Sequence, residues 1–503
     1  MALRGLDVRR VDGRPQVDRY NSVLGPLLFA VFMRALPLTM VGPLLPSIAR
    51  SLGADLATVG WIVATYASGS LVAQPVMGRL SDVRGRRTIL LWCITLFAAG
   101  SLWCALSVSL WALIVGRMIQ ALGAGGIQPV VTAIVGEQTE EQERGGALGA
   151  MYAMFGLGTM AGALVGGAAV DGALFLSRNA SIWPVLRAEL ASFPWHAVFW
   201  INVVLAAIAF RLALTLSQKP DLRSGAAARR SSTIDVVGVA CVLVFTVFVM
   251  GAATTQALTA AAYLGGAAVC VAALVIWEKR STAPLFDPDL FENGTGFVYV
   301  IALLFGVPSF TLTIYSATYF IARFGASAAQ SGLALFGLAT LYAIGAVVGG
   351  RAVRSAGEKP PLATGLVLAG IGLLALMIAS SALGAAAAMA LGGFGLGLVS
   401  APPNALILKY VPPNRAGAAT GVASLCATSG SVTAPAAVSA FLHYRLGSDA
   451  ANMRPEFLLG AALCALCAIL VAALPRGNGG SASKAGDLEP GGHETDPSRF
   501  QAR

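Results

Sequence analysis

Long apolar runs, separated by short polar or charged segments, fill almost the whole chain. Fourteen of these runs approach the ~20 residues that an α-helix needs to cross a hydrocarbon layer of ~30 Å. None shows the alternation over ~10 residues that is typical of a transmembrane β-strand. We therefore predict an all-α polytopic membrane protein whose fourteen transmembrane helices span 24–47, 58–77, 88–107, 110–136, 146–170, 196–216, 235–252, 260–277, 296–321, 330–350, 361–381, 384–409, 416–440 and 456–474.

The composition supports this prediction. Of the 503 residues 56% are apolar and only 12% are charged, which is more apolar surface than a soluble core of this size can bury. Residues 1–20 are polar and basic and lack the apolar core of a cleavable signal, so we expect the first helix to act as its own insertion signal. Cys464 and Cys467 have no histidine or further thiol partners nearby, so we predict buried apolar thiols, no metal site and no cofactor.

Positive charge is distributed unevenly along the chain. With the amino terminus inside, 25 of the 34 Lys and Arg residues fall in cytoplasmic segments, six in outer segments and three in helices. This asymmetry follows the positive-inside rule and, with an even number of helices, predicts that both termini are cytoplasmic. Topology thus explains the net charge of +10, and we expect no nucleic-acid partner.

A charged, glycine-containing segment occurs twice. Residues 78–87 (GRLSDVRGRR) lie between the second and third predicted helices, and a decayed copy occupies residues 350–359 (GRAVRSAGEK). Two further pairs of landmarks recur at nearly the same offset, namely Pro37 with Pro308 and residues 144–149 (RGGALG) with 415–421 (RAGAATG). Such an internal repeat indicates two related helical bundles that move against each other.

The repeat predicts the organisation of the chain. We expect a cytoplasmic tail at 1–20, a six-helix bundle at 21–216, two inserted helices with linkers at 217–294, a second six-helix bundle at 295–475, and a disordered cytoplasmic tail at 476–503. Two related bundles imply a pseudo-two-fold axis along the membrane normal and a cavity between the bundles.

The first copy resembles the signature loop of the major facilitator superfamily, Gly-x-Leu-x-Asp-basic-x-Gly-basic-basic. Val83 replaces the basic residue that usually follows the aspartate, and Arg84 can compensate for it. In that family the loop latches the two halves in the outward-facing state, and we expect Asp82 to lie at the positive N-terminal end of the helix that starts near Gly417. The alternative is a loop that only sets topology. The predicted latch residues are Gly78, Asp82, Arg84, Gly85, Arg86 and Arg87.

Two more stretches resemble motifs of the same family. Residues 117–125 resemble its second motif, Arg-x-x-Gln-Gly-x-Gly, with an intramembrane Arg117. Such an arginine is a candidate functional residue, although hydrogen bonding to carbonyls of the first helix is a structural alternative. The fifth helix resembles the antiporter motif but has Ala163 where proline is usual, which weakens the inference to antiport. Its small residues predict close helix packing at Gly158, Gly162, Gly166 and Gly167.

The fourteen-helix plan resembles the drug/proton antiporter branch of the superfamily, over roughly residues 20–475. This resemblance implies a secondary transporter in the plasma (cytoplasmic or inner) membrane that exports small amphipathic or lipophilic compounds in exchange for protons. It also implies a monomer that contacts lipid and is not an enzyme. A membrane sensor or enzyme is a remote alternative, because the sequence contains no nucleotide loop, metal cluster or catalytic triad.

The chain departs from that branch in its first helix. Pro37 stands where a buried aspartate is usual, and no acidic residue falls deep in a predicted span. Arg34 and Arg117 instead place two cations near mid-depth, which suits an anionic substrate, because arginine binds carboxylates and phosphates bidentately. This observation favours an organic-anion or lipid porter without proton antiport; the alternative is that Arg34 extends toward the cytoplasm or faces backbone carbonyls.

Three amides complete the predicted substrate or coupling site. Gln120 follows Arg117 by one helical turn, and Gln128 and Asn404 lie beside prolines in corresponding helices of the two bundles. Proline frees backbone carbonyls and bends helices, so these positions are candidate gate or cavity elements. The alternative for each amide is a role in helix packing alone.

Overall fold

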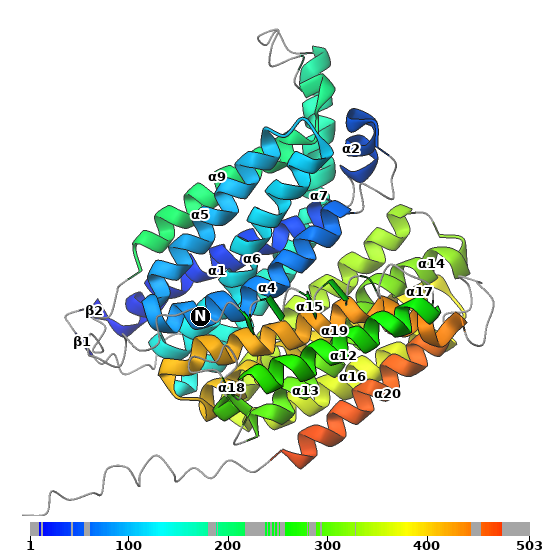
Figure 1. Ribbon diagram of the computed structural model, residues 1–503. Coiled ribbons are helices and arrows are strands. Elements are labelled where there is room, and N and C mark those ends of the chain that lie inside the picture. Colours follow the sequence, from blue (N-terminus) through cyan, green and yellow to red (C-terminus); the bar gives the residue numbers. More distant parts are fainter. Residues whose placement is uncertain are drawn as a thin grey trace, which may run out of the picture.

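The computed structural model describes residues 10–11, 14–41, 44–54, 61–179, 190–216, 257–278, 288–291, 294–326, 328–443 and 454–474, with single residues or pairs at 188, 237–251 and 280. Within this part of the chain almost every element is a helix, as expected. The exception is a small antiparallel hairpin of β1 (Arg10–Val11) and β2 (Arg14–Pro15). The fold is therefore the predicted all-α membrane fold (Figure 1).

The first bundle is built from six long helices. The short helix α2 (Leu45–Leu52) caps one end of this bundle (Figure 1). The helix α6 lies at its centre, with both flanks buried against α4 and α5. The six helices are α1 (Gln16–Met40), α4 (Trp61–Arg84), α5 (Arg86–Ala105), α6 (Leu110–Gln138), α7 (Glu141–Asn179) and α9 (His196–Leu214).

The second bundle repeats this plan with more interruptions. A π-helical turn, η3 (Thr311–Tyr315), follows Pro308 and separates α13 (Thr295–Phe310) from α14 (Ser316–Phe324). The remaining elements are η2 (Pro288–Phe291), α15 (Ala328–Ala356), α16 (Lys359–Ile378), α17 (Ala382–Ser400), α18 (Pro402–Tyr410), η4 (Pro413–Arg415), α19 (Ala416–His443) and α20 (Arg454–Ala473).

Several predicted boundaries were wrong. The helix α1 begins at Gln16, so the tail predicted at 1–20 already contains a hairpin and the start of a helix. The predicted helix 24–47 is divided into α1 and α2, and α2 has proline in its first turn. The predicted helix 384–409 corresponds to one apolar span of 29 residues, Ala382–Tyr410, in which α17 and α18 are separated at Ala401 because Pro402 has no backbone N–H for the helix hydrogen bonds.

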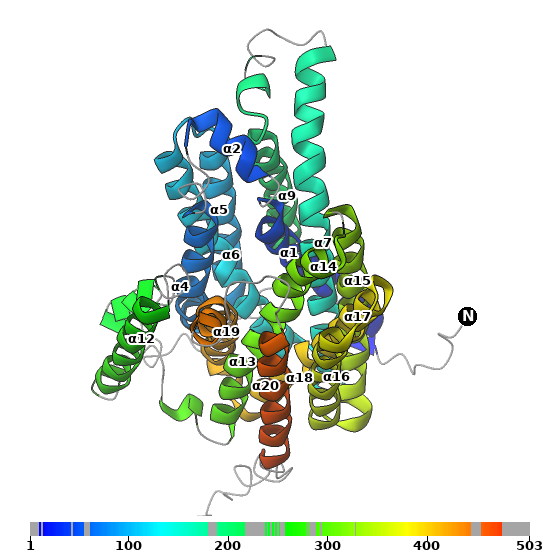
Figure 2. The ribbon, with the colours of Figure 1, turned by 90° about the vertical axis from the view of Figure 1, so that its right-hand side faces the viewer.

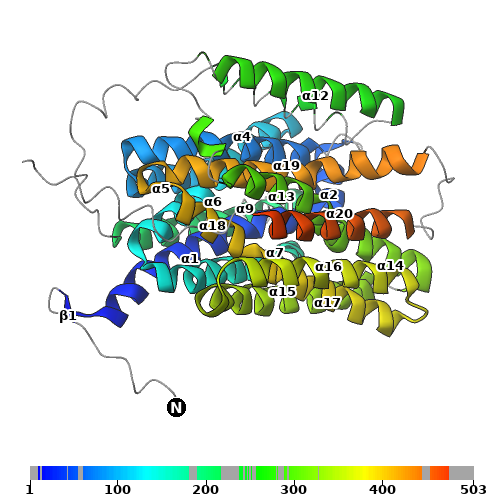
Figure 3. The ribbon, with the colours of Figure 1, turned by 90° about the horizontal axis from the view of Figure 1, so that it is seen from below.

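The inserted pair is described in part. The helix α12 (Ala257–Glu278) corresponds to the predicted span 260–277 and packs on α19 at the periphery of the molecule (Figures 2 and 3). Most of the predicted span 235–252 lies outside the described residues. Among the residues that are described, ten helices are long and apolar enough to cross a membrane. The total of fourteen spans stays a prediction.

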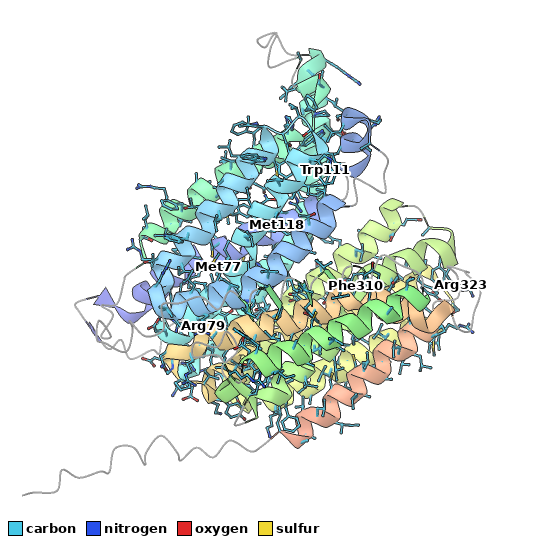
Figure 4. All side chains as sticks on the ribbon, viewed as in Figure 1. Met77, Arg79, Trp111, Met118, Phe310 and Arg323 are labelled. Atoms are coloured by element: carbon cyan, nitrogen blue, oxygen red, sulfur yellow. The ribbon has the colours of Figure 1, made fainter. Side chains whose placement is uncertain are left out.

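The two bundles meet along two pairs of helices. One pair is α4 with α19 and the other is α7 with α15, so each bundle contributes one helix of its first half and one of its second. Figure 1 shows the ribbons close together near α18 and diverging toward α2 and α14. In Figure 4, Arg79 lies at the end where the bundles meet and Arg323 at the end where they diverge. The positive-inside prediction assigns the closed end to the cytoplasm.

Candidate functional site

The loop between α4 and α5 is a single glycine. Gly85 has φ +91° and separates the two helices, and Gly357 has φ +78° at the corresponding point between α15 and α16. A side chain would be strained at either backbone angle, which explains why glycine occupies both copies of the motif. The structure thus confirms that these two glycines hold equivalent positions in the two bundles.

Asp82 bridges the two bundles. Its carboxyl oxygens accept hydrogen bonds from the backbone N–H groups of Gly417 (2.9 Å) and Ala418 (2.7 Å) in the first turn of α19. These N–H groups have no partner within the helix, and the helix dipole is positive there. The position expected for Asp82 from the sequence is therefore the position that the structure gives it.

The basic residues of the motif divide into two groups. Arg86 binds Asp82 (3.2 Å) and Glu137 (2.9 Å) and also donates to the carbonyl of Pro413 in the second bundle. Arg87 instead donates to the carbonyl of Leu214 (2.7 Å) at the end of α9 in its own bundle. Arg84 lies 5.9 Å from the ring of Trp92 in α5, also in its own bundle. Of these three arginines, Arg86 contacts the second bundle, whereas the described contacts of Arg84 and Arg87 lie within their own bundle.

Glycine pairs set the close approach of the bundles. A Cβ atom on Gly78 would strike the carbonyl of Gly417 and come within 3.3 Å of the Cα of Gly421. By the same arrangement, a Cβ on Gly145 of α7 would come within 2.5 Å of the carbonyl oxygen of Gly350 on α15. The first glycine of each motif copy, Gly78 or Gly350, therefore packs on the opposite bundle, whereas Arg354 replaces the aspartate in the second copy.

Burial raises the pKa of Asp82 to about 7, with a smaller contribution from Glu137, while Arg86 and the two backbone donors act in the opposite direction. A solvated aspartate has a pKa of about 4. If opening the closed end solvates Asp82, the closed arrangement binds a proton more tightly than the open one. The closed arrangement is then most favoured below pH ~4, and it loses that advantage as the pH rises through 7.

We therefore expect the closed population to fall between pH 5 and pH 8 and to be constant above this range. Spin labels can be attached at the exposed residues Thr215 and Ser355, which lie at the closed ends of the two bundles, in a protein whose native cysteines have been replaced. The distribution of distances between the two labels would then report the closed population. In the Asp82→Ala variant the distribution should not change with pH. A pH response that persists in this variant would assign the effect to another group.

Arg117 and Gln120 lie inside the first bundle. Arg117 is 1% exposed, donates to the Oε1 atom of Gln120 (2.6 Å) and lies 4.0 Å from the ring centroid of Tyr66. Gln120 in turn donates to the hydroxyl of Ser101 (2.8 Å). The carbonyl that Arg117 approaches is that of Ile62 in α4, at 3.5 Å, and not one in α1. This satisfied network connects α4, α5 and α6.

Arg34 has a different environment, where the bundles meet. Its Nη1 atom makes one long hydrogen bond, 3.4 Å to the carbonyl of Ala124, and its Nε atom is buried without a partner. The guanidinium lies 5.0 Å from the ring centroid of Phe155. Its electrostatic neighbours are the tyrosines Tyr66, Tyr152 and Tyr342, the last of them from the second bundle.

Gln128 and Asn404 meet at Tyr152. Asn404 of α18 donates to the hydroxyl of Tyr152 on α7 (2.6 Å), and Gln128 of α6 lies near the same hydroxyl, with its amide nitrogen 3.8 Å from the sulfur of Met151. Tyr342 of α15 and Ser400 of α17 lie beside each other in the second bundle, across the interface from Tyr152. We call these residues, together with Arg34, the central cluster: Arg34, Gln128, Tyr152, Tyr342, Ser400 and Asn404. The sequence analysis missed Tyr342, although a tyrosine near the middle of the apolar span 330–350 was the available signal.

The predicted packing glycines of α7 face α1. Cβ atoms on Gly158, Gly162 and Gly166 would each collide with a backbone carbonyl of α1, those of Phe32, Leu36 and Met40 respectively. These contacts follow the four-residue spacing of the glycines. Gly167 is also part of α7, but its contacts lie outside the described part of the structure. The antiporter-like motif thus makes a tight joint within the first bundle.

The comparisons with known proteins identify the family. A model of the Major Facilitator Superfamily matches residues 27–435, with a second match over 297–495. The chain belongs to the Major Facilitator Superfamily. Its structure is similar to the fucose transporter FucP in the outward conformation, with a TM-score of 0.65, 14% identity, and coverage of 90% of this chain and 98% of FucP.

Three curated relatives match much of the chain. The uncharacterized transporter YvkA of Bacillus subtilis is 27% identical over 84% of this chain and 91% of its own length. The multidrug resistance protein Stp of Mycobacterium tuberculosis is 28% identical over 79% of this chain and 70% of Stp. The uncharacterized transporter Rv1877 of the same species is 30% identical over 63% of this chain, which spans less than half (43%) of that protein. The protein is therefore a multi-pass transporter of this superfamily.

Proposed function

We propose that this transporter exports small amphipathic or lipophilic compounds by alternating access. The observation that supports the mechanism is the composition of the closed interface, where glycines pack on glycines and Asp82 holds the first turn of α19. Such a joint buries few large side chains, so it can separate at a modest cost. Motion about it would expose the central cluster to one side of the membrane at a time.

The substrate class rests on two lines of support. Stp is named as a multidrug resistance protein, and the MdtP protein of Bacillus subtilis, 26% identical over 74% of this chain, is named as a multidrug transporter. The central cluster also contains the rings of Tyr152 and Tyr342, which offer both an apolar face and a polar edge and so suit amphipathic compounds. We further propose a monomer in the plasma (inner) membrane, with both termini in the cytoplasm.

Transport by purified protein in liposomes tests this proposal. A pH gradient and a membrane potential are imposed separately, and the efflux of an anionic and a cationic amphiphile is followed. Efflux of either compound under either gradient supports the proposal, and dependence on the pH gradient would indicate the proton exchange that the drug/proton antiporter resemblance implies. Liposomes that contain the Gly145→Val variant serve as the control for leakage. If neither compound moves under either gradient, the proposal is wrong.

A second candidate function, an organic-anion porter without proton antiport, is favoured by one specific observation. Among the described residues, the electrostatic neighbours of Arg34 are tyrosines and include no carboxylate. The next subsection develops this observation into a substrate class.

A further inference from the structure

Arg34 is a cation in the membrane interior that lacks a counter-ion among the described residues. It lies in the middle of the apolar part of α1, residues 23–40, and it is desolvated by burial. Its hydrogen bond to the carbonyl of Ala124 is long (3.4 Å), and its buried Nε atom has no partner among the described residues. An unpaired charge in such a position is costly, and arginines inside membrane proteins generally pair with an acid or mark a substrate site.

Arg117 shows what a structural arginine looks like in the same bundle. Its guanidinium is satisfied by Gln120 and stacked on Tyr66, and it is almost fully buried. Arg34 has no comparable side-chain partner among the described residues. The contrast indicates that the free hydrogen-bonding capacity of Arg34 serves a group that is not part of the protein.

The surroundings of Arg34 define the chemistry of that group. The hydroxyls of Tyr152 and Tyr342 come from opposite bundles and lie in its electrostatic neighbourhood, and both can donate to an anion. The ring of Phe155, 5.0 Å from the guanidinium, supplies an apolar face beside the charge. A compound with one carboxylate or sulfonate and an apolar body would satisfy both features.

We propose that Arg34 binds the acidic group of an anionic amphiphile, and that the membrane potential drives the export of this substrate. This inference rests on the proposed export function and specifies its substrate and its energy source. Because the cytoplasm is electrically negative, the exit of an anion is favourable without a proton. A potential of about 100 mV sustains a roughly 50-fold outward gradient of a monoanion.

The test uses liposomes that contain the full-length protein. They are loaded with radiolabelled taurocholate, a monoanionic amphiphile, or with ethidium, a lipophilic cation. A potassium diffusion potential, negative inside, is set with valinomycin at equal pH on both sides. We expect the potential to accelerate taurocholate efflux by wild-type protein. Arg34→Gln should reduce this efflux at least tenfold, Arg34→Lys should retain part of it, and Arg34→Glu should abolish it.

The exposed Arg211, at the end of α9, provides a matched control, since Arg211→Gln removes the same charge away from the central cluster. This variant should export taurocholate as the wild type does. Thermal unfolding in detergent gives an independent readout, because taurocholate should stabilise the wild type and Arg34→Lys but not Arg34→Gln, even if that variant is less stable.

Three outcomes would overturn the inference. Arg34→Gln could export and bind taurocholate like the wild type, wild-type protein could export ethidium and not taurocholate, or taurocholate efflux could require a pH gradient. Each of these outcomes leaves the proposed export function intact. The absence of efflux for both compounds under every gradient would instead contradict the proposed function itself.

Discussion

Replacing Gly145 by valine should reduce transport at least tenfold, because the end at which the two bundles meet can then no longer close. A Cβ atom at this position would come within 2.5 Å of the Gly350 carbonyl oxygen and 2.8 Å of the Cβ of Val353. The carbonyl belongs to a helix backbone and cannot rotate away, so α7 and α15 must separate. Overpacking of this kind typically costs about 1–3 kcal/mol, and the upper half of that range shifts an equilibrium at least tenfold.

The adjacent glycine supplies the control. A Cβ atom on Gly146 would meet nothing within 4 Å, so Gly146→Val should insert, fold and transport nearly as the wild type does. Spin labels at Thr215 and Ser355 should show a longer distance in Gly145→Val only. Equal transport by the two variants would mean that the α7–α15 contact is not part of the transport cycle.

Replacing Asp82 by asparagine should also reduce transport at least tenfold. Both carboxyl oxygens of Asp82 accept backbone N–H bonds from α19. Asparagine retains one acceptor oxygen, and its amide nitrogen would face the second N–H group as another donor. The variant also loses the ion pair with Arg86. Hydrogen bonds to charged groups contribute about 1.5–3 kcal/mol each, which corresponds to at least a tenfold change in the closed population.

Protonation of Asp82 should not have the same effect. The hydroxyl oxygen of a protonated carboxyl can still accept a hydrogen bond, whereas an amide nitrogen cannot. Low pH and the asparagine variant should therefore act in opposite directions on the spin-label distance. Arg84→Gln removes a charge from the same motif without touching the other bundle, and it should leave transport nearly unchanged. A large loss in this variant would show that the general charge of the motif matters more than the contact of Asp82 with α19.

The helical architecture was predictable because it depends on local properties of the chain. Apolar runs of the right length define helices wherever the solvent is hydrocarbon, and the repeated glycine motif indicated two bundles. Helix ends were predicted less well. The division of 24–47 into α1 and α2 and the π-helical turn after Pro308 depend on how prolines and neighbouring helices satisfy the backbone, which periodicity alone does not reveal.

The candidate site was predicted in part. The sequence indicated the partner of Asp82, because motif and pseudo-symmetry together pointed to the start of α19. It grouped Arg34 with Arg117 because both lie at mid-depth in the first bundle. The structure separates them, since Arg117 is satisfied by Gln120 within its bundle and Arg34 faces tyrosines of both bundles.

The sequence by itself determined the membrane environment, the helical class, the internal repeat and the glycines that permit close packing. Each of these follows from local composition or from spacing along one chain. Only the tertiary structure decided which polar side chains are satisfied and which are free, because hydrogen-bond partners come from segments far apart in sequence. Tyr152 and Asn404 are 252 residues apart, and their contact depends on how the two bundles dock. The lack of a counter-ion for Arg34 among the described residues likewise depends on which segments the docking of the bundles brings beside it.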